Sequence, residues 1–571
     1  MSRKLTNFAV AAAVILATDK VVAQEIAPVS PSRIAPRPER PGDTLQPPQL
    51  APPLIDLPTE PSPSFSPVVP LPEERIFVSE FNFVGNTVFS DEQLAEIAQP
   101  YLQRQITFSD LVSLRTQITD LYVDAGYTTS GAFVPPEGNE RVDLSSGNPT
   151  IQIVEGGVEE IEFIGDDRLE WYIRSRLEGA LSPLNQTDLE EALRLLQVDP
   201  LINNISVDIS AGSRPGFSTL TVKAISQPSF QWDVGANNGR VPSIGSNQLE
   251  TQLSASNLLS LGERFTVGTS ITEGSSTFNA GVEVPVNANN GTVAFSYAQI
   301  NAQIVEDPLD EFDIESDGRV YDLSFRQPIV RRIDDRAIEE FSVGLNATRL
   351  ESKTTLSGLP FAISPGADED GETRITEISA VQEYSRRAVD SAFLVRSRLS
   401  VGIDAFDATV GGEPDAQYIA WVGQAGWLQT IGDDMQLLIT GDIQLTGDQL
   451  VPLSQFSLGG SRSIRGYRQD ALISDSGASL VAELSIPVVN PSDSQQINII
   501  PFAGAGIGWN NSAERAIDDN FIAAIGIGAQ YEWNNFITRA NYAVPFTKVG
   551  TDGDSLQEEG FDFELRYQLR F

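Results

Sequence analysis

The hydrophobic pattern of the chain changes near residue 228. Before that point, apolar residues recur at helical spacing between short alternating stretches, and after it apolar and polar residues alternate with a period of two. Helical spacing indicates amphipathic helices, whereas a period of two indicates strands with two different faces. The sequence therefore predicts α+β modules followed by a long all-β region.

Residues 75–155 form the first predicted α+β module. Ser90, with Gln93 three residues on, is a capping box that opens a helix, and Gly126 ends the second helix. That second helix places Leu111, Leu114, Ile118 and Leu121 on one face. The predicted order is strand, helix, helix, strand, strand, with the strands at residues 77–83, 127–129 and 151–154.

Residues 156–227 repeat this plan, with a spacing of about 75 residues that favours two tandem modules. A helix at 171–177 is followed by a second helix that Thr187 is predicted to cap. The second helix turns apolar residues inward, and these are Leu189, Ala192, Leu193 and Leu196. The predicted strands are 158–164, 205–209 and 220–225.

The last segment gives the clearest two-faced strand. From 561 to 571 every odd position is apolar and every even position is polar, and Phe571 ends the chain. Aromatic residues on one face and charges on the other suit a barrel with lipid outside and water inside. At about ten residues a strand, residues 228–571 allow roughly 14 to 18 transmembrane strands. A soluble β-sandwich, which also alternates, remains the alternative.

Alternating connection lengths place one unusual loop. Short turns alternate with long loops when the connections are counted back from the last strand. The preceding strands are predicted at 535–547, 520–534, 497–509 and 479–490. Long loops lie outside the cell, so residues 446–477 form an external loop. Its segment 458–467 contains Gly459, Gly460, Ser463 and Arg465 and lacks the acidic sequence of 306–311, which is typical of a solvated loop.

A packed loop with a buried arginine needs an anion, and the barrel lumen is the polar cavity that can receive it. The residues Leu480, Ala482, Leu484 and Ile486 predict that the even positions of their strand face lipid. Glu483 then faces the lumen as a bidentate partner for Arg465. The other interpretation is that Glu483 only lines a wet pore.

Composition narrows the possible functions. The net charge of −40 argues against a nucleic-acid partner. The absence of Cys and His excludes disulfides, a Ser-His-Asp triad and the usual zinc sites, and we expect no cofactor and no metal. No enzymatic function is expected, although carboxylate-only chemistry stays formally open.

The N-terminal residues predict export. A basic start, an apolar stretch and small residues predict a signal peptide at 1–23. A linker follows at 24–74, where 15 of the 35 prolines lie between residues 24 and 72. No later run reaches 18 apolar residues, which argues against a transmembrane helix.

Several motifs resemble those of one family. Phe-Val-Gly-Asn-Thr-Val-Phe at 83–89, with Gly85 and Asn86, precedes Ile-Thr-Asp-Leu-Tyr at 118–122. Gly126 and Tyr127 open Gly-Tyr-Thr-Thr-Ser, and Val-Glu-Gly follows at 154–156. The set resembles a polypeptide-transport-associated (POTRA) domain, and 456–467 resembles the lumenal loop of two-partner secretion translocators of the haemolysin-activator type.

The resemblance implies a mainly β protein in the cell outer membrane: two tandem POTRA domains in the periplasm and a monomeric, 16-stranded antiparallel barrel. The POTRA domains would capture an unfolded exoprotein by strand addition, and the exoprotein would cross the lumen without ATP. An outer-membrane insertase or a passive porin is the alternative. Barrel-assembly machinery and periplasmic chaperones would assist biogenesis in outer-membrane lipid, with an assembly signal at Tyr567, Leu569 and Phe571.

The same resemblance assigns roles within the loop. Ile464, Arg465, Gly466 and Tyr467 stand at the family's loop motif, with Ile464 where valine is usual. Arg465 would anchor the loop, and Glu483 would be one acidic partner. Gly504 stands where the family has a second partner, an aspartate, so part of the anchor is missing from this sequence.

Overall fold

The computed structural model describes residues 55–56, 75–135, 148–214, 216–334, 336–432, 434–492, 495–512, 515–549 and 553–571. The predicted signal peptide and the predicted linker, apart from the two-residue strand β1 (Ile55–Asp56), lie outside the described residues. The chain divides into one unit at Ala51–Gln227 and another that contains Pro228–Phe571.

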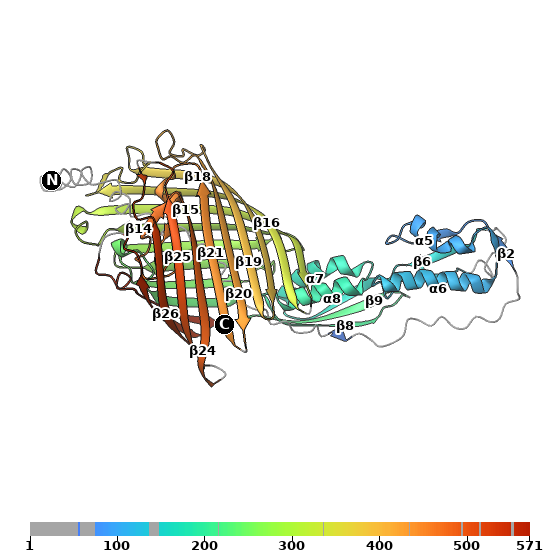
Figure 1. Cartoon of the computed structure of the whole chain (residues 1–571). Coiled ribbons are helices and arrows are strands. Elements are labelled where there is room, and N and C mark those ends of the chain that lie inside the picture. The colour runs from blue at the N-terminus through green and yellow to red at the C-terminus, as the bar shows by residue number, and fades with distance from the viewer. Residues whose placement is uncertain are drawn as a thin grey trace. The chain divides into compact units, whose positions relative to one another are not determined.

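The first module packs two helices against short strands (Figure 1). A sheet of order β3-β6-β5 and a separate β2–β4 pair surround a core that contains Leu94, Leu114 and Ile118. The elements are β2 (Ile76–Val78), β3 (Asn82–Val84), α5 (Asp91–Ala98), η1 (Gln99–Tyr101), β4 (Arg104–Ile106), α6 (Phe108–Asp124), β5 (Gly131–Phe133) and β6 (Thr150–Val154).

Two strand predictions in this module were wrong. The single strand at 77–83 is two strands with different partners, because the chain bends at Ser79 between them. The strand at 127–129 is a turn, since Gly126 has a φ of +92° and Ser130 N donates to Tyr127 O. The capping box at Ser90 is confirmed.

The second module has the predicted order of elements, with one sheet of order β1-β8-β9-β7. Its helices and sheet share a buried core. Thr187 is not the cap of the second helix, because Asn185 Oδ1 accepts from the backbone N–H groups of Thr187 and Asp188. The elements are β7 (Val158–Gly165), α7 (Asp167–Leu181), α8 (Gln186–Gln197), β8 (Ile202–Ala211) and β9 (Ser218–Ser226).

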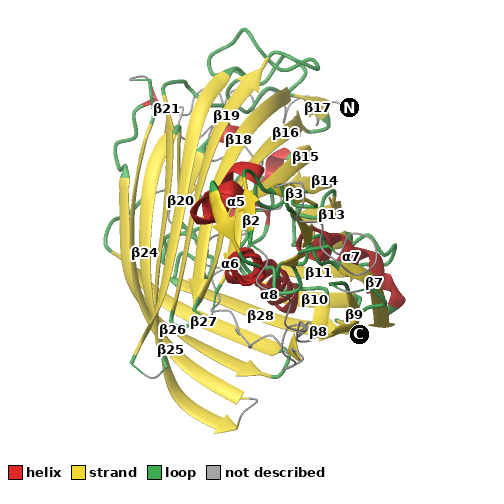
Figure 2. Cartoon of the chain, turned by 90° about the vertical axis from the view of Figure 1, so that its right-hand side faces the viewer, coloured by secondary structure: helices red, strands yellow, loops and turns green. Residues whose placement is uncertain are grey.

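The second unit is a closed antiparallel barrel of 16 strands, whose ring is visible in Figure 2. The barrel closes where β10 pairs with β28. Its strands are β10 (Phe230–Asn237), β11 (Gln248–Ser256), β12 (Arg264–Ile271), β13 (Ser275–Pro285), β14 (Thr292–Gln303), β15 (Ile314–Ile333), β16 (Ala337–Leu356), β18 (Glu372–Ala388), β19 (Ser391–Ile403), β20 (Tyr418–Ile431), β21 (Met435–Thr446), β24 (Ser476–Ser492), β25 (Gln495–Trp509), β26 (Phe521–Trp533), β27 (Phe536–Pro545) and β28 (Phe561–Arg570).

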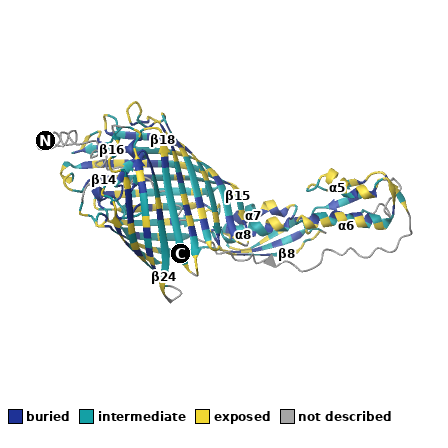
Figure 3. Ribbon diagram, in the orientation of Figure 1, coloured by how far each residue is buried: buried dark blue, intermediate teal, exposed yellow. Residues whose placement is uncertain are grey.

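Smaller elements lie in the connections between barrel strands. They are η2 (Pro242–Ile244), η3 (Asp310–Phe312), β17 (Leu359–Pro360), η4 (Pro452–Ser454), β22 (Phe456–Leu458) and β23 (Leu472–Ser474). The strands carry mostly half-buried and exposed residues along the wall in Figure 3. Along β24, Leu480 is 59% exposed and Val481 is 8% exposed, as the predicted alternation requires. Within the described residues, no helix is long and apolar enough to cross a membrane.

Candidate functional site

The connection from β21 to β24 folds back onto the inner face of the barrel. It contains the β22–β23 hairpin, which the sequence did not predict, and it buries apolar side chains against the wall. The shared cluster contains Leu458, Ile464, Tyr467 and Leu472 from the loop and Val481, Ile522 and Ala524 from the wall. The loop is therefore packed, as its sequence predicted.

Glycines shape the tip of this loop. Gly459, Gly460 and Gly466 have φ values of +104°, +92° and +95°, which side chains rarely adopt. Ser463 Oγ accepts from Gly459 N at 2.8 Å and so closes the turn between them. A Cβ on Gly466 would lie 3.1 Å from the Cβ of Ala543 on the wall, so the tip lies directly on β27.

Arg465 pairs with Glu483, but the two carboxylate oxygens of Glu483 bind two different arginines. Arg465 Nη2 donates to Glu483 Oε1 at 2.6 Å, and Arg539 Nη2 donates to Glu483 Oε2 at 2.6 Å. The predicted bidentate contact is therefore wrong, because Arg539 of β27 occupies the second oxygen. The Arg465 and Glu483 side chains are 10% and 13% exposed, so the three charges form a largely dehydrated group.

Two further contacts fix the guanidinium of Arg465. Its Nε donates to Ser461 O at 3.2 Å, and its Cζ lies 4.6 Å from the centre of the Phe502 ring. A cation over an aromatic face gains electrostatic stabilisation that grows as water is excluded. These are the contacts that hold Arg465 here in addition to Glu483.

Gly504 lies directly under Ile464. A Cβ at Gly504 would meet Ile464 Cδ1 at 3.0 Å and Val481 Cγ2 at 3.3 Å. The δ-methyl of Ile464, which valine lacks, therefore fills the space above a residue that has no side chain. Ile464 and Gly504, where the sequence was expected to depart from the motif, are therefore in contact, and the packing between them is apolar.

Tyr467 fastens the loop to the ends of two wall strands. Its hydroxyl donates to Ala523 O at 2.9 Å and lies 2.8 Å from Thr547 Oγ1. The ring is buried in the cluster of the loop and the wall. Tyr467 thus adds a hydrogen-bonded anchor on β26 and just beyond β27.

Arg468 connects the loop to two other external connections. Its Nη2 donates to Glu306 at 2.8 Å, in the β14–β15 connection, and its Nη1 donates to Glu558 at 3.1 Å, in the β27–β28 connection. The prediction that 306–311 is freely solvated is therefore wrong at Glu306. Arg468 ties three external loops together, which local sequence could not reveal.

A second part of the inner wall is lined by polar side chains and borders a cavity of about 470 Å³. The cavity lies along β10 to β13 and β28. Its lining includes Gln231, Asp233, Gln252, Asn279, Arg566 and Gln568. Odd positions of β13 face this space, whereas the neighbouring Phe278 is 46% exposed on the outer surface.

The C-terminal residues close the barrel. Tyr567 and Leu569 lie opposite Val234 and Trp232 in the β10–β28 register. Phe571 exchanges backbone hydrogen bonds with Phe230, and their rings stack with centres 5.6 Å apart. The segment expected to direct assembly is thus the seam strand.

In the first module, several of the motif residues converge on Glu155. Its carboxylate accepts from Thr87 N at 2.6 Å, Val88 N at 2.8 Å and Tyr122 OH at 2.7 Å, and also from Thr87 Oγ1. Burial alone would raise the pKa of Glu155, but these hydrogen bonds outweigh it and lower the pKa below the ordinary value. Burial, and then the bond to Glu155, raise the pKa of Tyr122.

Gly85 and Asn86 form the turn that presents Thr87 to Glu155. Gly85 has a φ of +95°, and a Cβ there would lie 2.4 Å from Ile153 O. Asn86 Nδ2 donates to Phe89 O and to Asp91 Oδ1, both at 2.9 Å. These motif residues therefore stabilise the fold of the module.

Gly126 lies at the junction of the two modules. Gln186 N donates to Gly126 O at 2.9 Å, and Asn185 Nδ2 donates to Ala125 O at 3.2 Å. Tyr127, which follows, packs against the first core and contacts Tyr122 edge to face. The cap of α8 is thus also the link to α6.

Sequence reasoning missed Arg539, Arg468 and Phe502. Alternation along 535–547 places Arg539 on the inner face, but no pattern says that it reaches Glu483 three strands away. Within the part of the chain that the structure describes, no cluster of three or more potential metal ligands occurs. The chemistry of the site is that of holding a loop with charge, hydroxyl and apolar contacts.

The chain matches two family models. Residues 216–531 match the model of the haemolysin secretion/activation proteins ShlB, FhaC and HecB, and residues 76–156 match the ShlB-type POTRA domain. The outer membrane transporter CdiB of Escherichia coli O6:K15:H31 is 24% identical over 432 residues, covering 72% of this chain and 68% of the relative. The heme/hemopexin transporter protein HuxB of Haemophilus influenzae is 25% identical over 175 residues, which is 30% of each chain.

Two solved structures share the fold. CdiB from Escherichia coli superposes with a TM-score of 0.64 at 20% identity, covering 90% of this chain and 94% of the other. CdiB from Acinetobacter baumannii gives a TM-score of 0.58 at 16% identity, covering 92% and 95%.

Proposed function

The chain belongs to the ShlB/FhaC/HecB family of haemolysin secretion and activation proteins, and we propose that its cargo is a haemolysin- or haemagglutinin-type exoprotein. As a family member, it is an outer-membrane transporter of two-partner secretion that works with a secreted exoprotein. The proposal concerns the kind of exoprotein and the way it is captured and passed.

The loop fixed inside the barrel carries the proposal. The arginine of this loop is held by a carboxylate that is 13% exposed, an aromatic ring and a backbone carbonyl, so the loop has a fixed place on the wall of the lumen. Buried charge is costly and is retained where it serves a structural or functional purpose. The polar cavity along β10 to β13 lies on a different part of the wall, and we take it as part of the route of the unfolded chain.

Capture is proposed to occur by strand addition to the periplasmic modules, which we take as two tandem POTRA domains. The sheet of the first module ends in β3 and β5, and each has one strand neighbour within that sheet. An extended peptide gains backbone hydrogen bonds along such an edge. In the second module, β1 pairs in parallel with β8, so that edge of the sheet is occupied.

We further propose that the protein acts as a monomer without enzymatic activity. The barrel closes on itself through β10 and β28, which supports a monomeric pore. The terminal strand offers Tyr567, Leu569 and Phe571 to the barrel-assembly machinery, and periplasmic chaperones would deliver the chain.

The test is deletion of residues 75–227 in cells that make a cognate haemolysin-type exoprotein. We expect the barrel to insert, as judged by heat-modifiable electrophoretic mobility, and export to be lost. An unrelated translocator with its own exoprotein, in the same cells, controls for general damage. Unchanged export would contradict the proposal, and export of a different class of exoprotein alone would contradict the choice of cargo.

The remaining alternative is an insertase, to which the POTRA modules would also be suited. Depletion of this protein separates the two functions. Loss of exoprotein export with normal levels of unrelated barrels supports secretion, whereas loss of many unrelated barrels supports insertion.

A further inference from the structure

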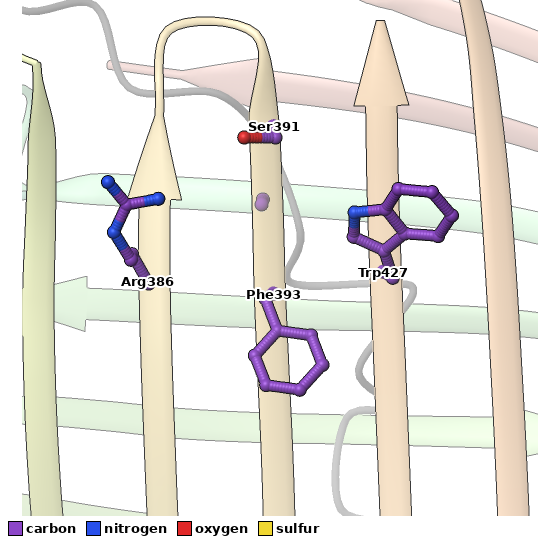
Figure 4. Close-up of a pocket in the computed structure, with 5 residues that line it drawn as sticks. Arg386, Ser391, Phe393 and Trp427 are labelled. Atoms are coloured by element: carbon purple, nitrogen blue, oxygen red, sulfur yellow. The ribbon is translucent and has the colours of Figure 1, made fainter.

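A small cavity lies on the outer surface of the barrel at the ends of β18, β19 and β20. It has a volume of about 350 Å³ and is lined by Arg386, Ser391, Ala392, Phe393 and Trp427 (Figure 4). The short connections after β18 and β20 mark this as the periplasmic end, since periplasmic turns are the short ones in such barrels.

The register shows that its main side chains share the lipid-facing side. Arg386 lies opposite Phe393, which lies opposite Trp427. The two rings are 39% and 40% exposed, and Arg386 is exposed as well. The cavity is therefore a notch in the outer wall, at the depth where aromatic and basic residues meet lipid headgroups.

Within the described residues Arg386 makes no direct ion pair, although its charge also acts electrostatically on the carboxylate of Asp334. Glu339 lies opposite Arg386 in the β16–β18 register, and its carboxylate accepts from Tyr384 OH at 3.0 Å. The inward-facing arginines nearby are paired, as Arg326 and Arg396 are with Glu383. A planar guanidinium with free donors is suited to a phosphate.

Trp427 supplies a second donor. The indole N–H groups of Trp232 and Trp421, which also face outward, donate to Thr251 and Ser397 at 2.7 and 3.0 Å. Trp427 has no such acceptor among the residues that the structure describes, and its ring nitrogen lies on the side toward β19 in Figure 4. Ser391 Oγ donates to Asp390 at 3.1 Å, so its oxygen remains free to accept.

From this geometry we propose that the notch binds the phosphodiester of an anionic glycerophospholipid in the periplasmic leaflet. Arg386 donates to the phosphate, and the Trp427 N–H donates to a phosphate or ester oxygen. Phe393 contacts the upper part of an acyl chain. Basic pockets at membrane boundaries select anionic headgroups in this way.

The test uses native mass spectrometry of the full-length protein released from a nonionic detergent with phosphatidylglycerol. We expect the parent protein to retain one phosphatidylglycerol molecule. The fraction of protein that retains the lipid should fall about tenfold in Arg386→Gln, because a hydrogen bond to a charged group is lost. Lipid retention should fall less in Trp427→Phe, since this substitution removes a single neutral donor. Arg386→Lys should retain part of the binding.

Matched controls come from the same surface. Arg332 lies two strands from Arg386 on the outer face, and Trp533 ends a strand with no arginine opposite it. Arg332→Gln and Trp533→Phe should retain the lipid as the parent does. Electrophoretic mobility shows that every variant is folded.

Several results would overturn the assignment. They are unchanged retention in Arg386→Gln, an equal loss in Arg332→Gln, and equal retention of zwitterionic phosphatidylethanolamine. Displacement of the lipid by inorganic phosphate would show that a free anion is the ligand instead. Exoprotein export is not a readout, so the result is independent of the proposed function.

Discussion

The inner wall of the barrel differs between the strands that hold the loop and the strands that border the open cavity. From β24 to β27, the wall offers Val481, Gly504, Ile522 and Ala524 to the loop, and Glu483 pairs with the loop arginine. From β10 to β13, it offers amides, hydroxyls and mixed charges.

The difference shows how one barrel can hold one peptide and pass another. Small and apolar residues allow close packing, so a loop there is held by dispersion and dehydration. A polar wall gives an unfolded chain hydrogen bonds that water can replace. We therefore propose that the fixed loop occupies one wall and that the exoprotein moves along the other.

The largest effect is expected when the loop loses its charge anchor. Arg465→Ala leaves Glu483 buried with one cation, and removing one partner of a buried pair costs about 3–5 kcal/mol. We expect exoprotein export to fall about tenfold or more while the barrel still inserts. Export and heat-modifiable mobility, measured on the same cells, check this.

Arg462 is the matched control for this substitution, since it lies in the same loop and is exposed. Arg462→Ala should export normally. If Arg465→Ala also exports normally, the anchored loop has no role in secretion.

A smaller effect is expected from introducing at Gly504 the aspartate that the resemblance implies for this position. Gly504→Asp places a carboxylate where the Cβ alone meets Ile464 Cδ1 at 3.0 Å. We expect export to fall several-fold, and Ile464→Val in the same chain to recover part of it. Ile464→Val alone should cost little, about 0.5–1.5 kcal/mol.

Comparing the parent, the two single variants and the double variant measures the coupling energy between positions 464 and 504. Residues in contact typically show a coupling energy of about 0.5–3 kcal/mol. Export losses that simply add would mean that Ile464 and Gly504 do not compensate each other.

Much of this site could be predicted from the sequence because a sheet has a strict side-chain period. Alternation placed Glu483 in the lumen, and alternating connection lengths placed the loop of Arg465 outside. Both assignments use residues close together in the chain. The barrel strands at the C-terminus were located for the same reason.

The rest depends on contacts between distant segments. Arg539 reaches Glu483 from three strands away, and Glu306 meets Arg468 across 162 positions of sequence. Alternation gives the face of each residue but not which side chains meet across a closed barrel. Neighbouring residues can also compete for the same role: both Asn185 and Thr187 could cap α8, and Asn185 does so.

Arg468 provides a milder way to disturb the loop-bearing side. Arg468→Ala releases Glu306 and Glu558 from the loop but leaves the Arg465 anchor intact. Because Glu306 is partly exposed, the ion pair contributes about 1 kcal/mol. We expect a higher open probability in planar-bilayer recordings and export within about twofold of the parent.

Glu306→Gln is the matched partner variant for that measurement. It should raise the open probability in the same direction but less, since Glu558 still holds Arg468. Recordings that match the parent in both variants would contradict a role for Arg468 in joining the external loops.

The smallest effect is expected in the first POTRA module, whose stability should decrease on acidification. The pKa of Glu155 is lowered by its hydrogen bonds, so its stabilisation is present above the ordinary carboxyl pKa and is lost as pH falls through the lowered one. Hydrogen exchange of residues 76–156 in the full-length protein should show protection that decreases on acidification. Glu155→Gln should be less protected at neutral pH and show a flatter dependence; an unchanged pH profile would contradict the assignment.

The most direct measurement asks which wall the exoprotein touches during secretion. A photoreactive amino acid is placed at Asn279 on the polar wall, at Ala524 under the loop, or at Phe278 on the lipid face. If the exoprotein passes along the polar wall, we expect crosslinks to it from position 279 and none from positions 524 and 278. No crosslink from position 279, or equal crosslinks from all three, would contradict passage along the polar wall.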